Sequence, residues 1–202
     1  MGKKDVFINC PFDNEFRSLL RVLIFTIIFI GYVPKLTLEK SDSSQTRISK
    51  ITELISASEL GIHDLSRIKA TKKGEFFRLN MPFELGMDFG NKCYSADNKE
   101  KKILILCSEK YDYQKALSDL AGCDIKSHNN VETQLVKVLR EWFHETVGVE
   151  DITGPTGIWY KYTDFLSELD TSFIRKGFSE KDLLELPISE YIKFVKKWVE
   201  DN

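Results

Sequence analysis

Two short stretches decide the predicted fold: LGIHD at residues 60–64 and NMPFELG at residues 80–86, with a polar loop between them. The first predicts a buried strand that ends in Asp64. The second predicts the start of a helix, with Pro82 at its first position and Glu84 in its first turn. We expect the two carboxylates to meet at the carboxyl edge of a sheet, which is where open α/β folds bind ligands.

Strand and helix patterns alternate on both sides of this segment. Short apolar runs predict buried strands, and apolar residues three or four positions apart predict the helices between them. This order specifies an α/β fold, a flavodoxin-like, doubly wound parallel sheet of about five strands. The expected strands lie at residues 6–9, 32–39, 60–64, 102–107 and 123–125, and the expected helices at 15–30, from 46, from 82, at 111–120 and at 130–143.

The character of the sequence changes after Gly148. Residues 151–157 are rich in Gly and Pro and indicate a linker, and aromatic residues then recur at helical spacing, which is typical of a packed core. We expect an α/β domain at 1–148 and a helical appendage at 149–202 that packs on it or on a partner subunit. The helix at 15–30 is apolar on nearly every face, so it should be enclosed by the sheet and by either this appendage or another subunit.

Charge, hydropathy and cysteine content argue against several classes of function. The formal net charge of the 202 residues is −2, so no overall field draws the chain to nucleic acid or to a membrane. The apolar window at 22–30 is too short to span a bilayer. The four cysteines form no CxxC pair and only three histidines accompany them, which argues against a zinc site. We expect a cytoplasmic protein that needs no metal.

Glu84 and Asp64 are the candidates for chemistry, and each also has a structural interpretation. A carboxylate in the first turn of a helix is stabilised by the helix dipole, but with Pro82 at the first position Glu84 would also complete a capping box. Asp64 could form an Asx turn in the loop that contains Ser66, or accept hydrogen bonds from ribose hydroxyls. Asn80 should lie beside them.

The motifs HDLS at 63–66, NMPFELG at 80–86 and GNK at 90–92 resemble those of the nucleoside 2-deoxyribosyltransferase-like and TIR-like superfamily. The opening FINCPFD at 7–13 is similar to the first-strand segment of the deoxyribosyltransferases, whose loop lines the base pocket. The resemblance covers roughly residues 5–108. It implies an N-glycosidase that cleaves the base–ribose bond of NAD or a related nucleotide, in a setting such as bacterial stress or antiviral defence.

By this resemblance Glu84 is the catalytic carboxylate, which stabilises an oxocarbenium-like state or traps it covalently. Asp64 would hold the sugar or serve the leaving base. The basic loop that begins at Arg67 and ends at Arg78, with Lys72 and Lys73 inside it, is a solvated surface loop or a lid over the phosphates. The expected substrate-binding residues are Asn9, Cys10, Pro11, Phe12, Ser66, Asn80, Met81 and Gly86.

Two other function classes stay open at this point. One is a nucleotide-binding sensor of the same fold without catalysis. The other is an interaction module that assembles through the apolar first helix and the aromatic tail. In each enzymatic or sensor case the partner is a small-molecule nucleotide, no cofactor is required, and a homo-oligomer is expected.

Overall fold

The computed structural model describes residues 4–39, 44–69 and 78–202 of the chain. All of its strands are parallel and form one sheet in the order β2-β1-β3-β4-β5, which is the flavodoxin-like order. The predicted fold class, a doubly wound parallel α/β sheet with a helical C-terminus, is confirmed. The strands are β1 (Asp5–Asn9), β2 (Val33–Lys35), β3 (Leu60–Asp64), β4 (Lys102–Cys107) and β5 (Lys126–Ser127).

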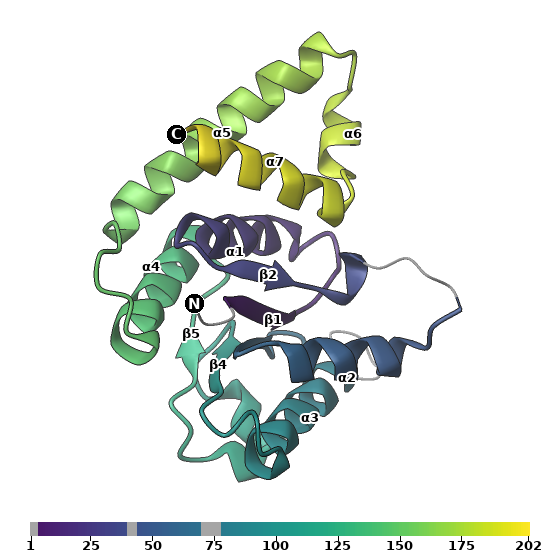
Figure 1. Cartoon of the computed structure of the whole chain (residues 1–202), viewed down its shortest axis with the longest axis vertical. Helices are drawn as coiled ribbons and strands as arrows, with labels where there is room; N and C mark the ends of the chain where they lie inside the picture. Colours follow the sequence, from purple (N-terminus) through teal and green to yellow (C-terminus); the bar gives the residue numbers. More distant parts are fainter. Residues whose placement is uncertain (1–3, 40–43, 70–77) are drawn as a thin grey trace.

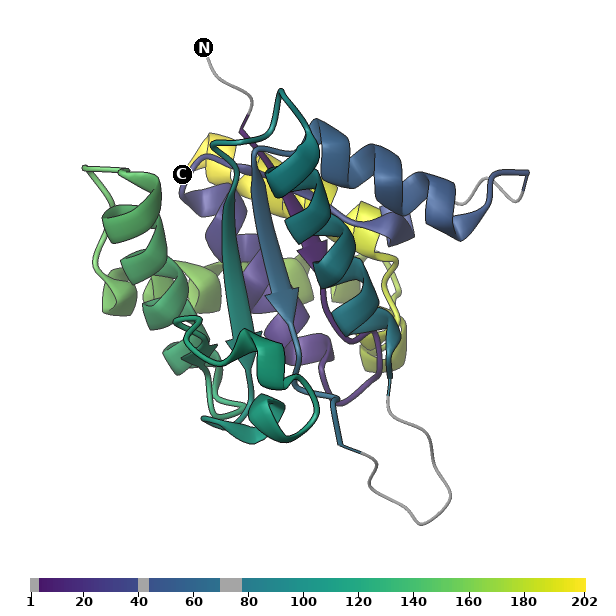
Figure 2. The same cartoon turned by 90° about the horizontal axis from the view of Figure 1, so that it is seen from below.

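Helices cover both faces of this sheet (Figure 1). Helices α2 and α3 pack side by side on one face, and α1 and α4 cover the other; Figure 2 shows α3 in front of the sheet and the C-terminal helices behind it. The chain after α4 adds an outer layer against α1. The helices are α1 (Arg17–Phe29), α2 (Arg47–Ala57), α3 (Asn80–Tyr94), α4 (Glu132–Trp142), α5 (Pro155–Arg175), α6 (Glu180–Leu184) and α7 (Ile188–Asp201).

Three local predictions were wrong. The helix expected at 111–120 is a pair of 3-10 turns, Asp112–Lys115 and Ser118–Leu120, because the backbone of Leu117 between them is not helical (φ −132°, ψ 65°). The last strand lies at Lys126–Ser127 rather than 123–125, and Ile125 is buried in the cluster that includes Met81 and Leu85 of α3. The strand expected at 32–39 ends at Lys35, and the 3-10 turn Thr37–Glu39 follows it.

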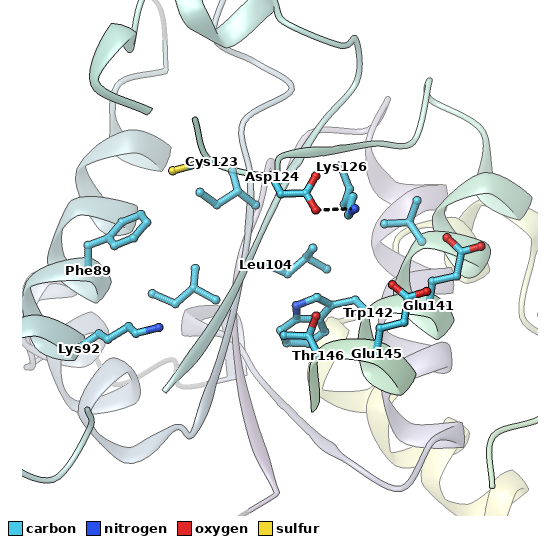
Figure 3. Close-up of a pocket in the computed structure, with 13 residues that line it drawn as sticks. Phe89, Lys92, Leu104, Cys123, Asp124, Lys126, Glu141, Trp142, Glu145 and Thr146 are labelled. Carbon is cyan, nitrogen blue, oxygen red and sulfur yellow. Dashed lines mark hydrogen bonds and ion pairs between the residues drawn. The ribbon is translucent and has the colours of Figure 1, made fainter. Parts of the chain in front are cut away.

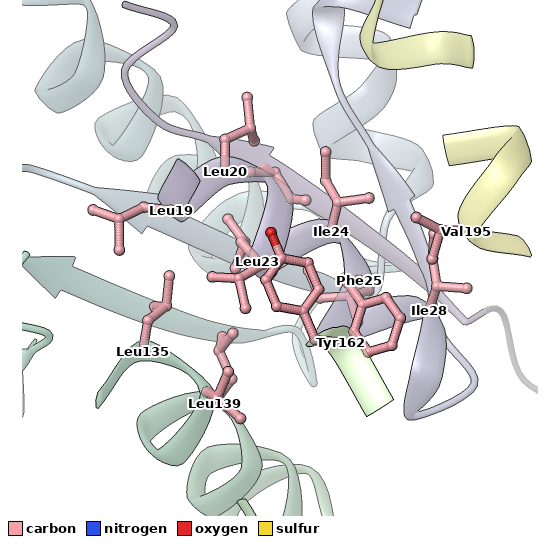
Figure 4. Close-up of a cluster of buried hydrophobic side chains, with 14 of the residues drawn as sticks. Leu19, Leu20, Leu23, Ile24, Phe25, Ile28, Leu135, Leu139, Tyr162 and Val195 are labelled. Atoms are coloured by element: carbon pink, nitrogen blue, oxygen red, sulfur yellow. The ribbon is translucent and has the colours of Figure 1, made fainter. Parts of the chain in front are cut away.

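The apolar helix α1 is enclosed by the C-terminal segment of the same chain. The ring of Phe25 lies 5.2 Å from that of Tyr162, 5.5 Å from that of Phe165 and 5.9 Å from that of Trp198. Figure 4 shows Phe25 beside Tyr162 of α5, with Val195 of α7 nearby. Tyr162, Phe165 and Trp198 of the tail are therefore core residues of the α1 face. In the part of the chain that the structure describes, no helix is long and apolar enough to cross a membrane.

Candidate functional site

The candidate site lies where β1 and β3 end next to each other, at the point where the strand order reverses. From β1 the chain passes outward to β2 and then returns to β3, so the loops after β1 and β3 diverge there. Nδ2 of Asn9, the last residue of β1, donates to the carbonyl of Met81 at 2.9 Å and lies 3.0 Å from Nδ1 of His63. One buried amide thus joins both strand ends to the first turn of α3.

Glu84 lies in the second turn of α3, not in the first as predicted. The helix begins at Asn80, so Pro82 is its third residue and Glu84 its fifth. Pro is tolerated at this point because the N–H that it lacks has no intrahelical acceptor in the first turn. The capping-box interpretation of Glu84 is therefore wrong, since a capping box needs the carboxylate at the third helical position.

The Glu84 carboxyl is buried, with 3% of the residue exposed. Among the described residues, the one side chain hydrogen-bonded to it is Arg47, the first residue of α2, at 3.4 Å from Nη2 to Oε1. Burial raises the pKa of Glu84, and the positive charge of Arg47 offsets this only in part. Glu84 therefore holds its proton to higher pH than an exposed glutamate.

Asp64 ends β3 and has both of its oxygens engaged. Oδ1 accepts from the backbone N–H of Ser66 at 2.8 Å, which is the Asx-turn contact expected from the sequence. Oδ2 lies 3.0 Å from Nε2 of His128, a fully buried residue that directly follows β5. The same Nε2 lies 3.1 Å from Oγ of Ser66. The carboxylate is thus held in one orientation by groups from two loops.

The hydrogen bonds of His128 determine its tautomer. The backbone N–H of Asn130 donates to Nδ1 at 3.1 Å, so Nδ1 is an acceptor. In the neutral ring the proton is then on Nε2, which donates to Asp64. His128 therefore positions Asp64 and is not oriented to take a proton from Ser66. His128 was not predicted as a site residue because the last strand was placed too early, and its place directly after that strand was the available signal.

A second buried network runs beneath the site. His63 accepts from Asn9 on Nδ1 and donates from Nε2 to Oδ2 of Asp88 at 2.9 Å. Nζ of Lys101 lies 2.6 Å from Oδ1 of Asp88 and donates to the carbonyl of Ile55 at 2.7 Å. Burial lowers the pKa values of His63 and of Lys101, and Asp88 opposes both shifts.

Gly61 is the residue that lets this network lie against the sheet. A Cβ at position 61 would come within 2.2 Å of Oδ2 of Asp88. Asp88 itself lies four residues after Glu84 and on the same face of α3 as Met81 and Leu85. Asp88 could therefore have been found from the sequence, because it is an acidic residue on the apolar face of the predicted helix.

The two predicted lid arginines meet at the loop after β1. Arg67 makes two hydrogen bonds of 3.1 Å to Asp13 and one of 2.9 Å to Glu15, and Arg78 lies 3.8 Å from Asp13. Partial burial acts to raise the pKa of Asp13, but the hydrogen bonds from Arg67 and from the Phe16 N–H outweigh it and lower that pKa. Both arginines are thus partly neutralised. Lys72 and Lys73 lie outside the described residues.

The remaining predicted site residues differ in how far they are buried and in whether they lie at the site. Cys10 is fully buried, and burial, followed by the negative charges of Asp64, Glu84 and Asp13, raises the pKa of its thiol well above the usual range. This thiol is a neutral packing group within electrostatic range of all three carboxylates.

Gly86 lies on the exposed side of α3 with open space around it, so the structure does not bring it to the site. Pro11 and Met81 are buried, Phe12 and Ser66 are half-buried, and Asn80 is exposed.

Comparisons of the chain with protein-family models, with curated proteins and with solved structures found no match. Among the described residues, no group of three or more His, Cys, Asp or Glu side chains is arranged to hold a metal ion.

Proposed function

We propose that the chain is an N-glycosidase that cleaves the bond between base and ribose in NAD or a related nucleotide, with Glu84 as the catalytic carboxylate. The observation that carries this proposal is the environment of Glu84: a buried carboxyl of raised pKa at the switch point of the sheet, contacted by one cation. A carboxyl whose pKa is raised by burial is typical of active sites, where it exchanges a proton with the substrate or faces a charge that develops on it.

The division of roles follows from the hydrogen bonds. Both oxygens of Asp64 are already engaged, whereas Glu84 has one long contact to Arg47. Glu84 is thus the carboxylate available to stabilise or trap an oxocarbenium-like ribosyl group. Asp64, fixed by His128, is suited to accept a hydrogen bond from a ribose hydroxyl.

Asn9 supports the same assignment. Its Nδ2 is used twice, but its Oδ1 is buried and has no hydrogen-bond partner among the described residues. A buried unpaired acceptor is costly, by about 1–3 kcal/mol. A hydroxyl of a bound ribose would satisfy it. Arg67 and Arg78, which flank residues 70–77, would bind phosphate by exchanging it for Asp13.

The test is direct. Purified protein is incubated with NAD and, separately, with nucleoside monophosphates, and the released base is measured by chromatography. We expect release that falls roughly a hundredfold or more in Glu84→Gln, because one charge-stabilising group is removed. Glu200→Gln, which removes an exposed carboxylate on α7, is the matched control and should keep full activity.

A nucleotide sensor of the same fold is the second candidate, favoured by the observation that Glu84 and Asp64 are almost fully enclosed. It is supported if wild type releases no base above Glu84→Gln while a nucleotide raises the melting temperature. If neither base release nor a thermal shift is found, both candidates fail. An interaction module built on α1 and the aromatic tail has no support, since these surfaces pack on each other within the chain.

A further inference from the structure

One edge of the sheet is only half covered. β4 pairs with β3 from Lys102 to Leu106, but the two-residue β5 pairs only with Leu106 and Cys107. In the described sheet, no strand therefore lies beside the outer edge of residues 102–105. This edge is not at the candidate site, which lies at the carboxyl ends of β1 and β3.

The peptide groups on this edge can be assigned from their neighbours. The N–H of Lys102 and the carbonyl of Leu106 point toward the β3 side, because they bond to Glu59 and Leu65. Direction alternates along a strand, so Ile103 and Ile105 direct their N–H groups away from β3. Unpaired groups of this kind are a template for another strand.

A cavity of about 340 Å³ lies along this edge. Figure 3 shows it in front of β4, with Phe89 and Lys92 of α3 on one side and Trp142 of α4 on the other. The loop that leads into β5 closes its upper end. The cavity is thus a slot between the two helical layers, in the position that a longer β5 would fill.

The two walls of the slot carry opposite charges. On the α4 side are Glu141 and Glu145, one helical turn apart, and on the α3 side is Lys92. Lys92 and Glu145 form no ion pair among the described residues, while Glu141 has one contact of 3.9 Å, to Lys137. Side chains of an inserted strand alternate between the two walls. The slot therefore fits a strand with basic residues toward α4 and apolar or acidic residues toward α3.

A second copy of this chain does not fit this pattern. Antiparallel pairing of two β4 edges about a two-fold axis normal to the sheet would place α4 against α4. Glu141 and Glu145 would then face the same carboxylates of the other copy, and like charges in close juxtaposition are unfavourable.

We propose that this slot binds an extended peptide segment of another protein, which adds a strand to the free edge of β4 and presents lysine or arginine to Glu141 and Glu145. Backbone hydrogen bonds to Ile103 and Ile105 provide the pairing, and alternate side chains provide the selectivity.

The probe is the fluorescein-labelled peptide Lys-Val-Val-Glu-Lys-Val, whose length is about that of the strand edge and its flanks. Its binding to the full-length protein is measured by fluorescence anisotropy. The charge-reversed peptide Glu-Val-Val-Lys-Glu-Val is the comparison and should bind at least about fivefold more weakly. N-methylation of the peptide residues whose N–H groups point toward β4 should abolish binding. N-methylation of the alternate residues, whose N–H groups point away from β4, should not. This arm needs no protein variant and is independent of folding defects.

Two protein variants locate the site. Glu145→Lys should weaken binding about fivefold, and Asp164→Lys, on an exposed face of α5, should leave it within about twofold. Ile103→Pro removes an outward N–H without removing a bond to β3, and should abolish binding while circular dichroism shows a folded protein. Equal affinity for both peptides, no binding, or a self-association that Ile103→Pro eliminates would each overturn the proposal.

Discussion

Nη2 of Arg47 lies 3.4 Å from Oε1 of Glu84, although Arg47 begins α2 and Glu84 belongs to α3. The contact joins a half-exposed cation to a buried carboxyl. Among the described residues it is the one ion pair of the proposed catalytic group. Because Arg47 reaches solvent, salt can screen this pair and so change the pKa of Glu84.

Glu84 should make the protein less stable as the pH rises. Burial raises its pKa above the ordinary value of 4.5, so the folded state binds this proton more tightly than the unfolded chain. Its favourable contribution is fully present below that value and is lost as the pH rises through the folded pKa. Urea unfolding of wild type and of Glu84→Gln over this range should show a smaller fall for the variant. Parallel curves would contradict the assignment, and Arg47→Met should enlarge the wild-type fall.

Breaking the Asp88–Lys101 pair should strongly lower the stability of the fold. Asp88→Asn leaves a buried ammonium without its counter-ion, and we expect the free energy of unfolding to drop by about 3–5 kcal/mol. Asp124→Asn is the matched control, because its pair with Lys126 is exposed and should contribute less than about 1 kcal/mol. Equal effects of the two substitutions, measured by urea unfolding, would show that Asp88 is not the charge that keeps Lys101 buried.

Gly61 and Gly86 should respond to alanine in opposite directions. At position 61 a Cβ would lie 2.2 Å from Oδ2 of Asp88, so Gly61→Ala should destabilise the fold by about 1–3 kcal/mol. At position 86 nothing lies within 4 Å, and Gly86→Ala should stabilise α3 by about 0.5–1 kcal/mol. Thermal melts compare the two. A Gly61→Ala protein as stable as wild type would mean that Asp88 can move away.

Phe25 should be essential for the layer between α1 and the C-terminal helices. Its side chain is fully buried against Tyr162, Phe165 and Trp198, and Phe25→Ala should cost about 3–5 kcal/mol. Phe83 is 60% exposed on α3, so Phe83→Ala should change stability by no more than about 0.5 kcal/mol. Unfolding midpoints that shift by the same amount in both variants would argue against a shared core.

Much of the fold could be predicted because it depends on local pattern. The unbroken apolar run at β4, the apolar strand that ends in Asp64 and the helix that carries Glu84 each have a clear periodicity. Where pattern is weak, prediction failed: β5 has two residues, and the start of α3 was placed two residues late because Pro82 was taken as its first position.

For the site, the sequence by itself determined that Asp64 ends a strand and that Glu84 belongs to the helix that follows, because both depend only on local pattern. Tertiary structure alone decided that His128 holds Asp64, that Arg47 meets Glu84 and that Asp88 pairs with Lys101. These partners are 13 to 64 residues apart in the chain, if one counts from Asp88 to Lys101 and from Asp64 to His128. No local periodicity encodes such pairings. They form because parallel strands bring distant loops to one edge, where burial makes each unpaired charge too costly to leave without a partner.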